Sequence, residues 1–362
     1  TILVVIQLAG GNDGLNTVVP HTDDNYFNLR PKLAIRKGLL PINEDLGFNP
    51  ACRELHQLFN EGQLSIIQNV GYPNPNRSHF RSTEIWETAS SSENVQREGW
   101  LGRYFDNACS GSPDEDADPT AVHLSDMIPQ SYLSEKSHSL FGMKSSGRFD
   151  RGTDPADLAY EKLLQAEHIE GNASYLQHTM MNTLVTERRV EKIISRYKPM
   201  ARYPGNKLAQ SLRRVAALIH ADMETRVYYV SQGGYDTHSG QLSRHTRLLA
   251  ELSGAMQAFQ QDLVAHKKDD QVMTMTLSEF GRRPSENGSA GTDHGTAAPL
   301  FVMGSKVNGG LMGSAPDLNI GENKDLKFST DFRSIYSSVL DRWFDADSSS
   351  ILGEKFDHLP FV

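Results

Sequence analysis

The first residues of the chain form the run ILVVIQL (residues 2–8), which is apolar at nearly every position. A strand with one solvated face alternates apolar and polar residues, so a continuous β-branched run indicates a strand buried on both faces. Strands of this kind occur in parallel sheets that are covered by helices on each side. The run therefore favours an α/β fold with a mostly parallel central sheet and helices on both faces.

The rest of the chain alternates between strand and helix patterns. Further strands are predicted over 64–70, 120–124, 226–231, 271–277 and 298–303, and helices over 51–60, 79–89, 239–266 and 331–344. Two polar segments, 110–119 and 144–156, are predicted to lie on the surface. A helical stretch over 157–198 and 206–221 follows them. We expect a single α/β domain over 1–362, with a helical insertion or subdomain over 157–221.

Composition narrows the classes of function. Lys and Arg number 36 against 45 Asp and Glu, so the net charge of −9 argues against nucleic acid as the main partner. No apolar run approaches the roughly 20 residues that a membrane helix needs. The two cysteines, Cys52 and Cys109, are too few for a disulfide scaffold or a thiolate zinc site, and the sequence leaves open whether they pair. A small anionic substrate remains compatible with this charge, because a bound metal can reverse the local sign.

Acidic residues follow three of the predicted strands in glycine-containing turns, and histidines lie near them. Ligands in open α/β sheets bind beyond the carboxyl ends of the strands, so in a parallel sheet these side chains converge on one edge. Carboxylates and imidazoles without a thiolate suit Zn²⁺, Mn²⁺, Fe²⁺ or Mg²⁺, and a cation removes the repulsion among clustered acids. We therefore expect a divalent metal, of open identity. The predicted ligands are Asp13, Asp236, His238, Glu279, Asp293 and His294.

Each of these residues also has an ordinary structural explanation. The alternatives are a turn former (Asp13), a helix cap (Asp236 or His238), a surface ion pair with Arg282 or Arg283 (Glu279) and a hydrogen-bonded loop histidine (His294). The shared placement of the set next to strand ends is what favours a site over these separate explanations.

Ser78 is the candidate nucleophile, because it follows the second strand and opens a helix whose free N–H groups favour an anion. Metal coordination could activate its hydroxyl. The alternative is an ordinary N-cap, which the local sequence alone favours. Arg77, Arg81 and Arg282 are the candidate side chains for binding phosphate or sulfate oxygens. His79 ranks behind these residues as a ligand or general acid.

Five segments together resemble the bacterial domain-of-unknown-function 1501 family. They are LVVIQLAGGNDGLNTVVP, VGYPNPNRSHFRSTEIWE, GGYDTHSGQ, TLSEFGRRPSENGSAGTDHGTAAPLFVMG and DFRSIYSSVLDRW. The resemblance spans almost the whole chain, and the segment from Thr276 to Gly304 is its most specific part.

That family is similar to the alkaline-phosphatase-like superfamily of phosphatases, phosphodiesterases, phosphomutases and sulfatases. The resemblance implies a first-strand Asp ligand at Asp13, a nucleophile at Ser78, and later metal ligands at Asp236, His238 and His294. Where the superfamily typically has an Asp-His pair, this chain has Glu279-Phe280, so one histidine ligand is missing. Relatives often carry a twin-arginine leader, which implies a periplasmic or exported protein, and the start at Thr1 is compatible with a removed leader.

Three hypotheses follow. The first is a metal-dependent hydrolase of phosphate or sulfate esters, with Ser78 as nucleophile and a small-molecule or glycan ester as substrate. The alternative is a catalytically inactive protein on the same fold that binds an anionic glycan or a surface partner, as the missing histidine would allow. A role of the helical region 157–221 in oligomerisation is a third hypothesis, and the oligomeric state stays open.

Overall fold

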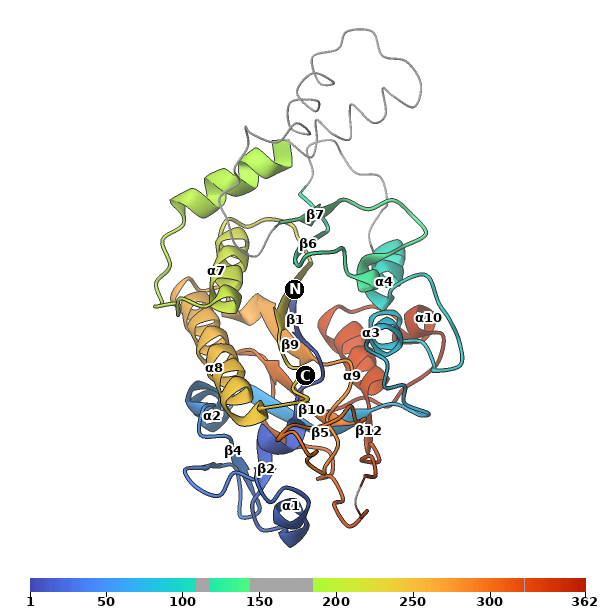
Figure 1. Cartoon of the computed structure of the whole chain (residues 1–362). Coiled ribbons are helices and arrows are strands. Elements are labelled where there is room, and N and C mark those ends of the chain that lie inside the picture. Colours follow the sequence, from blue (N-terminus) through green and yellow to red (C-terminus); the bar gives the residue numbers. More distant parts are fainter. Residues whose placement is uncertain (109–117, 144–184, 322) are drawn as a thin grey trace, which may run out of the picture.

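The computed structural model describes residues 1–108, 118–143, 185–321 and 323–362, and its centre is a sheet of nine strands (Figure 1). Eight of them lie in the order β11-β5-β10-β9-β1-β8-β6-β7, and β12 pairs with β5. The strands are β1 (Ile2–Ala9), β5 (Leu64–Gly71), β6 (Ala121–Leu124), β7 (Leu140–Gly142), β8 (Val227–Gly233), β9 (Val272–Leu277), β10 (Ala298–Met303), β11 (Gly310–Met312) and β12 (Thr330–Asp331).

The prediction of a mostly parallel sheet is confirmed. β1 pairs in parallel with β8 and with β9, β6 pairs in parallel with β7 and β8, and β11 and β12 run parallel to β5. The exception is β10, which is antiparallel to both of its neighbours, β5 and β9. The sequence pattern does not indicate this reversal, because a buried strand has the same apolar pattern in either direction.

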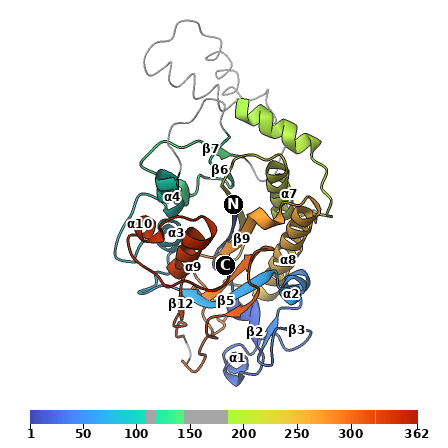
Figure 2. The same cartoon turned by 180° about the vertical axis from the view of Figure 1, so that it is seen from behind.

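Helices cover both faces of the sheet, as the apolar first strand predicts. Val4 and Ile6 of β1 belong to one buried cluster, whereas Leu3 and Val5 belong to another on the opposite face. The first cluster includes side chains of α2 (Arg53–Asn60), α7 (Lys207–His220) and α8 (Gln241–Ala265). The second includes side chains of α3 (His79–Thr88), α4 (Trp100–Ala108), α9 (Phe332–Ser338) and α10 (Ser348–Leu352). Both views show these two groups of helices on opposite sides of the sheet (Figures 1 and 2).

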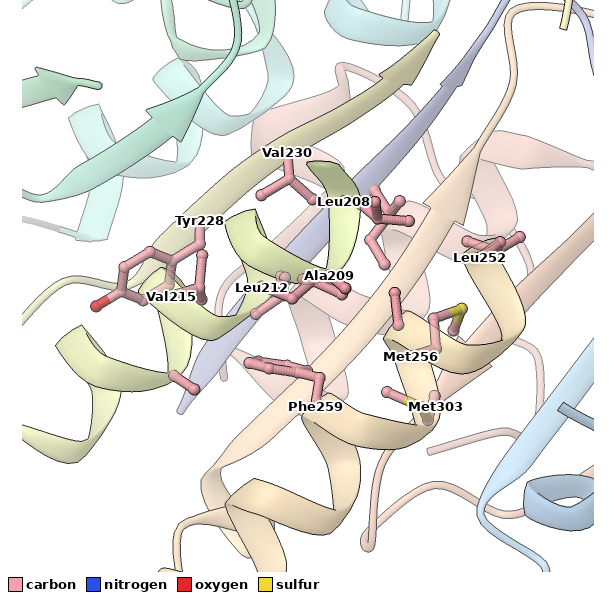
Figure 3. Close-up of a cluster of buried hydrophobic side chains, with 14 of the residues drawn as sticks. Leu208, Ala209, Leu212, Val215, Tyr228, Val230, Leu252, Met256, Phe259 and Met303 are labelled. Carbon is pink, nitrogen blue, oxygen red and sulfur yellow. The ribbon is translucent and has the colours of Figure 1, made fainter. Parts of the chain in front are cut away.

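α7 is an integral part of this core. Leu208, Leu212 and Val215 on α7 are buried, and they pack with side chains of α8 and β8 (Figure 3). The predicted helical insertion over 157–221 falls partly on residues 157–184, which lie outside the described residues. Its last part, α7, shares a buried cluster with α8 and with strands of the central sheet.

A small antiparallel sheet near the start of the chain has no counterpart in the sequence prediction. It has the order β2-β4-β3, with β2 (Val18–Pro20), β3 (Leu40–Pro41) and β4 (Leu46–Phe48), and α1 (Asp24–Leu29) follows β2. Its strands are two or three residues long, which is too short for a periodic pattern to show. Further elements are the 3₁₀ turns η1 (Gly14–Asn16), η2 (Gln130–Tyr132) and η3 (Asp269–Gln271), and a π-helical turn (Val339–Trp343) that continues α9. Residues 185–196 are also helical.

Two predictions made from composition can be placed on this fold. Among the described residues, no helix is long and apolar enough to cross a membrane. Cys52 is a free, buried thiol whose pKa burial raises, and Cys109 lies outside the described residues.

Leu212→Ala tests whether α7 supports the main core. Truncating a fully buried leucine removes transfer free energy and leaves a cavity, so the free energy of unfolding should fall by about 2–5 kcal/mol. Urea unfolding followed by circular dichroism measures this loss. Val264→Ala on α8, where the side chain is 44% exposed, is the control and should change stability by no more than about 0.5 kcal/mol. An equal, small effect of both variants would show that α7 is dispensable.

Candidate functional site

The predicted site residues lie at the edge of the sheet where the parallel strands end. The helix after β5 supplies His79, and the turns after β8 and β9 supply Asp236 and Glu279, in keeping with the rule for open α/β sheets. His294 reaches the same edge for a different reason. It precedes β10, and because β10 is antiparallel its first residues lie beside the last residues of its parallel neighbours, as the pair Ala298–Val70 shows. A parallel β10 would have placed His294 at the opposite edge.

Three of these side chains form a compact group. One ligand atom each from His79, Asp236 and His294 lies within 4.8 Å of the other two. His238 joins its rim, with Nε2 3.1 Å from Asp236 Oδ1 and 2.9 Å from His294 Nε2. We call these four residues the histidine cluster. Asp236, His238 and His294 were predicted as ligands, and the structure brings them together.

The Nδ1 atom of each imidazole in the cluster is hydrogen-bonded to an oxygen, which belongs either to a carboxylate or to a backbone carbonyl. The acceptors are Glu279 Oε1 for His79 (2.8 Å), Asp293 Oδ1 for His238 (3.3 Å) and the Arg77 carbonyl for His294 (2.8 Å). Such oxygens accept a hydrogen bond, so each Nδ1 is the donor and each Nε2 presents its lone pair to the cluster. This is the arrangement by which proteins orient metal-binding histidines.

The cluster fits a divalent cation. With both Nδ1 atoms protonated, the Nε2 lone pairs of His238 and His294 face each other across 2.9 Å, which requires a proton or a cation between them. Glu279 is buried, and its Oε2 has no hydrogen-bond partner among the described residues. An unpaired buried carboxylate oxygen is costly, and a nearby cation would offset that cost. Glu279 and Asp293, both predicted as ligands, in this structure hold His79 and His238.

The pKa shifts of these groups follow from their hydrogen bonds and burial. The hydrogen bond to Glu279 raises the pKa of His79, and burial lowers the pKa of His294. Partial burial disfavours ionisation of Asp236, but the hydrogen bond and charge of Arg282 outweigh it and hold the pKa of that carboxyl below its usual value. A hydrogen bond from Asn287 lowers the pKa of Asp293. Both carboxylates are thus ionised at neutral pH.

Ser78 occupies the N-cap position of α3, as predicted, but its side chain makes no capping hydrogen bond. It is exposed and stands between two residues that touch the cluster: Arg77 through its carbonyl and His79 through its ring. α3 is fixed at this place by Ser82, whose hydroxyl hydrogen bonds the Glu279 carbonyl and the Tyr72 hydroxyl. Ser78 therefore lies at the start of a helix whose first residue, His79, belongs to the cluster.

Phe280, which stands in place of an expected histidine, forms an apolar wall behind the cluster. Its ring is buried, and its centroid lies 4.9 Å from that of His79 and 4.6 Å from that of His294. A phenyl ring offers no atom to a cation, and here it packs against two imidazoles.

Asp13 lies outside the histidine cluster. Its Oδ2 accepts hydrogen bonds from Arg30 Nη1 (2.7 Å) and from the Gln241 side chain, and both members of the Arg30 ion pair are fully buried. Burial opposes ionisation of Asp13, but Arg30 outweighs it and lowers the pKa of that carboxyl. The sequence prediction of Asp13 as a metal ligand overlooked this partner, because Arg30 lies in a segment without a periodic pattern.

The three arginines predicted to bind substrate have different surroundings. Arg282 is buried and donates to backbone carbonyls and to the Asp236 carboxylate. Arg81 donates to the carbonyls of residues 91, 92 and 94 and pairs with Glu84. Arg77 alone is substantially exposed, with 45% of its side chain accessible and a 3.4 Å ion pair to Asp325.

The main residue that sequence reasoning underrated is His79. The available signal was its place directly after Ser78 at the start of the helix that follows β5, which is the same edge as the other candidates. His79 has no acidic neighbour in sequence, and its partner Glu279 is 200 residues away.

Asp13→Asn tests the structural role of the buried ion pair. Arg30 would remain buried without its counter-charge, so the free energy of unfolding at pH 7 should fall by about 3–5 kcal/mol. Folding lowers the pKa of Asp13 below its ordinary value of 3.8, so its stabilising effect is present above that pH and is lost as the pH falls through the folded-state pKa. The difference between wild type and variant should therefore shrink below about pH 4, as urea unfolding at several pH values would show.

Asp325→Asn is the control, because its partners Arg77 and Arg283 are partly exposed; it should cost at most about 1 kcal/mol. The folded Asp13→Asn variant should also bind metal as tightly as wild type. Weaker metal binding with unchanged stability would restore the ligand role predicted from the sequence.

Comparison with solved structures gives likenesses at low identity. The phosphoglycerol transferase GacH of Streptococcus pyogenes, in complex with sn-glycerol-1-phosphate, aligns with 100% of this chain and 81% of its own at 10% identity and a TM-score of 0.43. The C-terminal periplasmic domain of EcEptC from Escherichia coli, in complex with Zn, aligns over 84% and 73% at 7% identity and a TM-score of 0.42. These likenesses identify no substrate for the present chain.

The lipoteichoic acid synthase LtaP of Listeria monocytogenes aligns over 99% of this chain and 74% of its own, at 10% identity and a TM-score of 0.39. None of the curated proteins matches the chain. Residues 1–351 match the family model described as "Protein of unknown function (DUF1501)". The family resemblance predicted from the sequence is therefore confirmed, and the chain belongs to the DUF1501 family.

Proposed function

We propose that this protein is a metal-dependent hydrolase of phosphate or sulfate esters, with one divalent cation in the histidine cluster. The observation that carries the proposal is the convergence of three imidazole Nε2 atoms on the Asp236 carboxylate, each imidazole being anchored through Nδ1. A set of nitrogens with one carboxylate suits Zn²⁺, Fe²⁺ or Mn²⁺ better than Mg²⁺, which prefers oxygen ligands. When bound, such a cation lowers the pKa of a coordinated hydroxyl and neutralises charge on the transferring group.

Ser78 is the proposed nucleophile. Its hydroxyl is exposed and makes no capping hydrogen bond, and it lies at the start of a ten-residue helix. The free backbone N–H groups of the first turn favour the negative oxygens of a phosphate or sulfate group. Arg77 is the proposed side-chain partner of those oxygens, since its guanidinium is exposed and, among the described residues, its ion pair is the one to Asp325. Arg81 and Arg282 take no part in substrate binding here, because protein oxygens already occupy them.

The substrate class is proposed at the level of an anionic ester, either a small molecule or a glycan. The periplasmic or exported location rests on the family resemblance and stays a prediction.

A non-catalytic binding protein is the second candidate. Two observations favour it: Arg81 and Arg282 are engaged by the protein, and Phe280 replaces an expected histidine.

Substitution within the cluster separates metal binding from turnover. His79→Ala, Asp236→Asn and His294→Ala should each reduce bound metal. The alanine variants remove a ligand nitrogen, and Asp236→Asn removes the negative charge, from a group whose ligand atoms lie within 4.8 Å of one another. Ser78→Ala should keep wild-type metal content and lose ester hydrolysis. Elemental analysis by mass spectrometry, together with a panel of chromogenic phosphate and sulfate esters, measures both properties.

His220→Ala is the matched control, because His220 is an exposed histidine at the end of α7, before β8 begins. It should leave metal content and turnover unchanged. Wild-type protein that carries no stoichiometric metal after supplementation would contradict the proposed function. Metal binding without turnover of any ester, and with equal ligand affinity in Ser78→Ala, would favour the binding protein.

A further inference from the structure

Arg282 is among the most buried side chains of the molecule and is tied by hydrogen bonds to several separate turns. Its side chain is fully inaccessible to solvent. Its donors reach the carbonyls of Gly10, Gly11 (2.9 Å), Tyr235 (3.1 Å) and Thr292 (3.0 Å), and Nη2 lies 2.7 Å from Asp236 Oδ1. Residues 10 and 11 follow β1, residues 235 and 236 follow β8, and residue 292 precedes β10. One guanidinium thus connects three turns at the edge of the sheet that holds the histidine cluster.

The glycines after β1 make this connection sterically feasible. Gly10 has a φ of +119°, and a Cβ there would overlap the backbone nitrogen of Asp236. At Gly11, with a φ of +81°, a Cβ would lie 2.5 Å from the Phe280 ring and 3.3 Å from Arg282 Nε. Both positions therefore require glycine. The Gly10-Gly11 turn directs two carbonyls toward Arg282, and its Gly10 N–H donates to Glu279 Oε1 (2.8 Å), the oxygen that also anchors a histidine of the cluster.

Arg282 also determines how the carboxylate of Asp236 faces the cluster. Its Nη2 binds Oδ1, the oxygen that His238 and His294 also approach, at 3.1 and 3.3 Å. The other oxygen, Oδ2, lies 3.8 Å from His79 Nε2. Residue 282 also forms an isolated β-bridge with His294. The same residue therefore fixes one carboxylate and the backbone of one histidine.

We propose that Arg282 is the positioning residue of the metal site: by gathering the turns after β1 and β8 and the loop before β10, it holds Asp236 in the orientation that a cation needs. This inference rests on the proposed function, since it concerns the same cation. It gives Arg282 a role different from the substrate contact predicted from the sequence.

The chemistry requires arginine at this place. A guanidinium offers five N–H donors in a planar fork, whereas a lysine ammonium offers three donors at a single point. A lysine at position 282 could keep the charge next to Asp236, but one nitrogen cannot reach carbonyls on three turns. Removal of such a supporting partner typically weakens metal binding by about 10–100-fold.

The test compares Arg282→Lys with Arg283→Lys, a matched control at the next position. Arg283 Nε contacts Asp325 and no member of the cluster. Zn²⁺ affinity is measured by competition with a chromophoric chelator, and folding by circular dichroism and thermal unfolding. Arg282→Lys and a second variant, Arg282→Gln, should fold and bind Zn²⁺ about 10–100-fold more weakly, while Arg283→Lys should match wild type.

A double-mutant cycle with Asp236→Asn distinguishes positioning from general support of the fold. If Arg282 acts through Asp236, adding Arg282→Lys to Asp236→Asn should cause no further loss of Zn²⁺ affinity. Additive losses would overturn the inference, as would unchanged affinity in both folded single variants or failure of both to fold. If the losses are additive, or if the affinity of both single variants is unchanged, wild type still binds Zn²⁺ and the proposed function stands. Wild type that binds no Zn²⁺ would instead contradict the proposed function, and the inference with it.

Discussion

The candidate site depends on one constraint: β1 is buried on both faces and pairs in parallel with β8 on one side and β9 on the other. This pairing places the ends of three strands side by side, so the turns that follow them must share a small volume. Carboxylates and imidazoles from distant parts of the chain thereby come within hydrogen-bonding distance. The apolar run at the start of the chain is therefore the origin of both the fold and the polar site.

Bringing these groups together creates an electrostatic conflict that the protein resolves in two ways. Arg30 pairs with Asp13, and Arg282 donates to Asp236, so each of these carboxylates has a buried cation beside it. The facing Nε2 atoms of His238 and His294 contact each other and the Asp236 carboxylate, and no cationic side chain among the described residues lies between them. A divalent cation in the histidine cluster would resolve this remaining conflict. The proposed metal binding thus follows from the facing lone pairs of these two imidazoles.

The sequence predicted the parallel sheet and most long elements because buried strands and amphipathic helices have characteristic periods. It also placed Asp236, His238 and His294 at a common edge. For His294 the stated reason was wrong: the residue is there because β10 is antiparallel, which no apolar pattern reveals. The partners Arg30 of Asp13 and Glu279 of His79 were equally hidden, because pairs separated by long stretches of chain leave no local signal. Arg282 appeared as an anion-binding residue, since the sequence does not show that a side chain is fully buried.

Glycine explains why the rest of the site cannot be inferred from polar residues alone. Gly10 and Gly11 bring the backbone of one turn against Asp236 and Phe280, and only a structure reveals these contacts. The ligand geometry is therefore produced by backbone packing as much as by the ligands.

The most direct measurement of the central claim is a crystal structure of the metal-loaded protein with anomalous diffraction recorded at the absorption edge of the metal. The account predicts one strong anomalous peak about 2.0–2.2 Å from imidazole nitrogens and from a carboxylate oxygen, namely those of His79, His294 and Asp236, with His238 adjoining. A metal bound at Asp13, or no peak among these four residues at full metal loading, would contradict it.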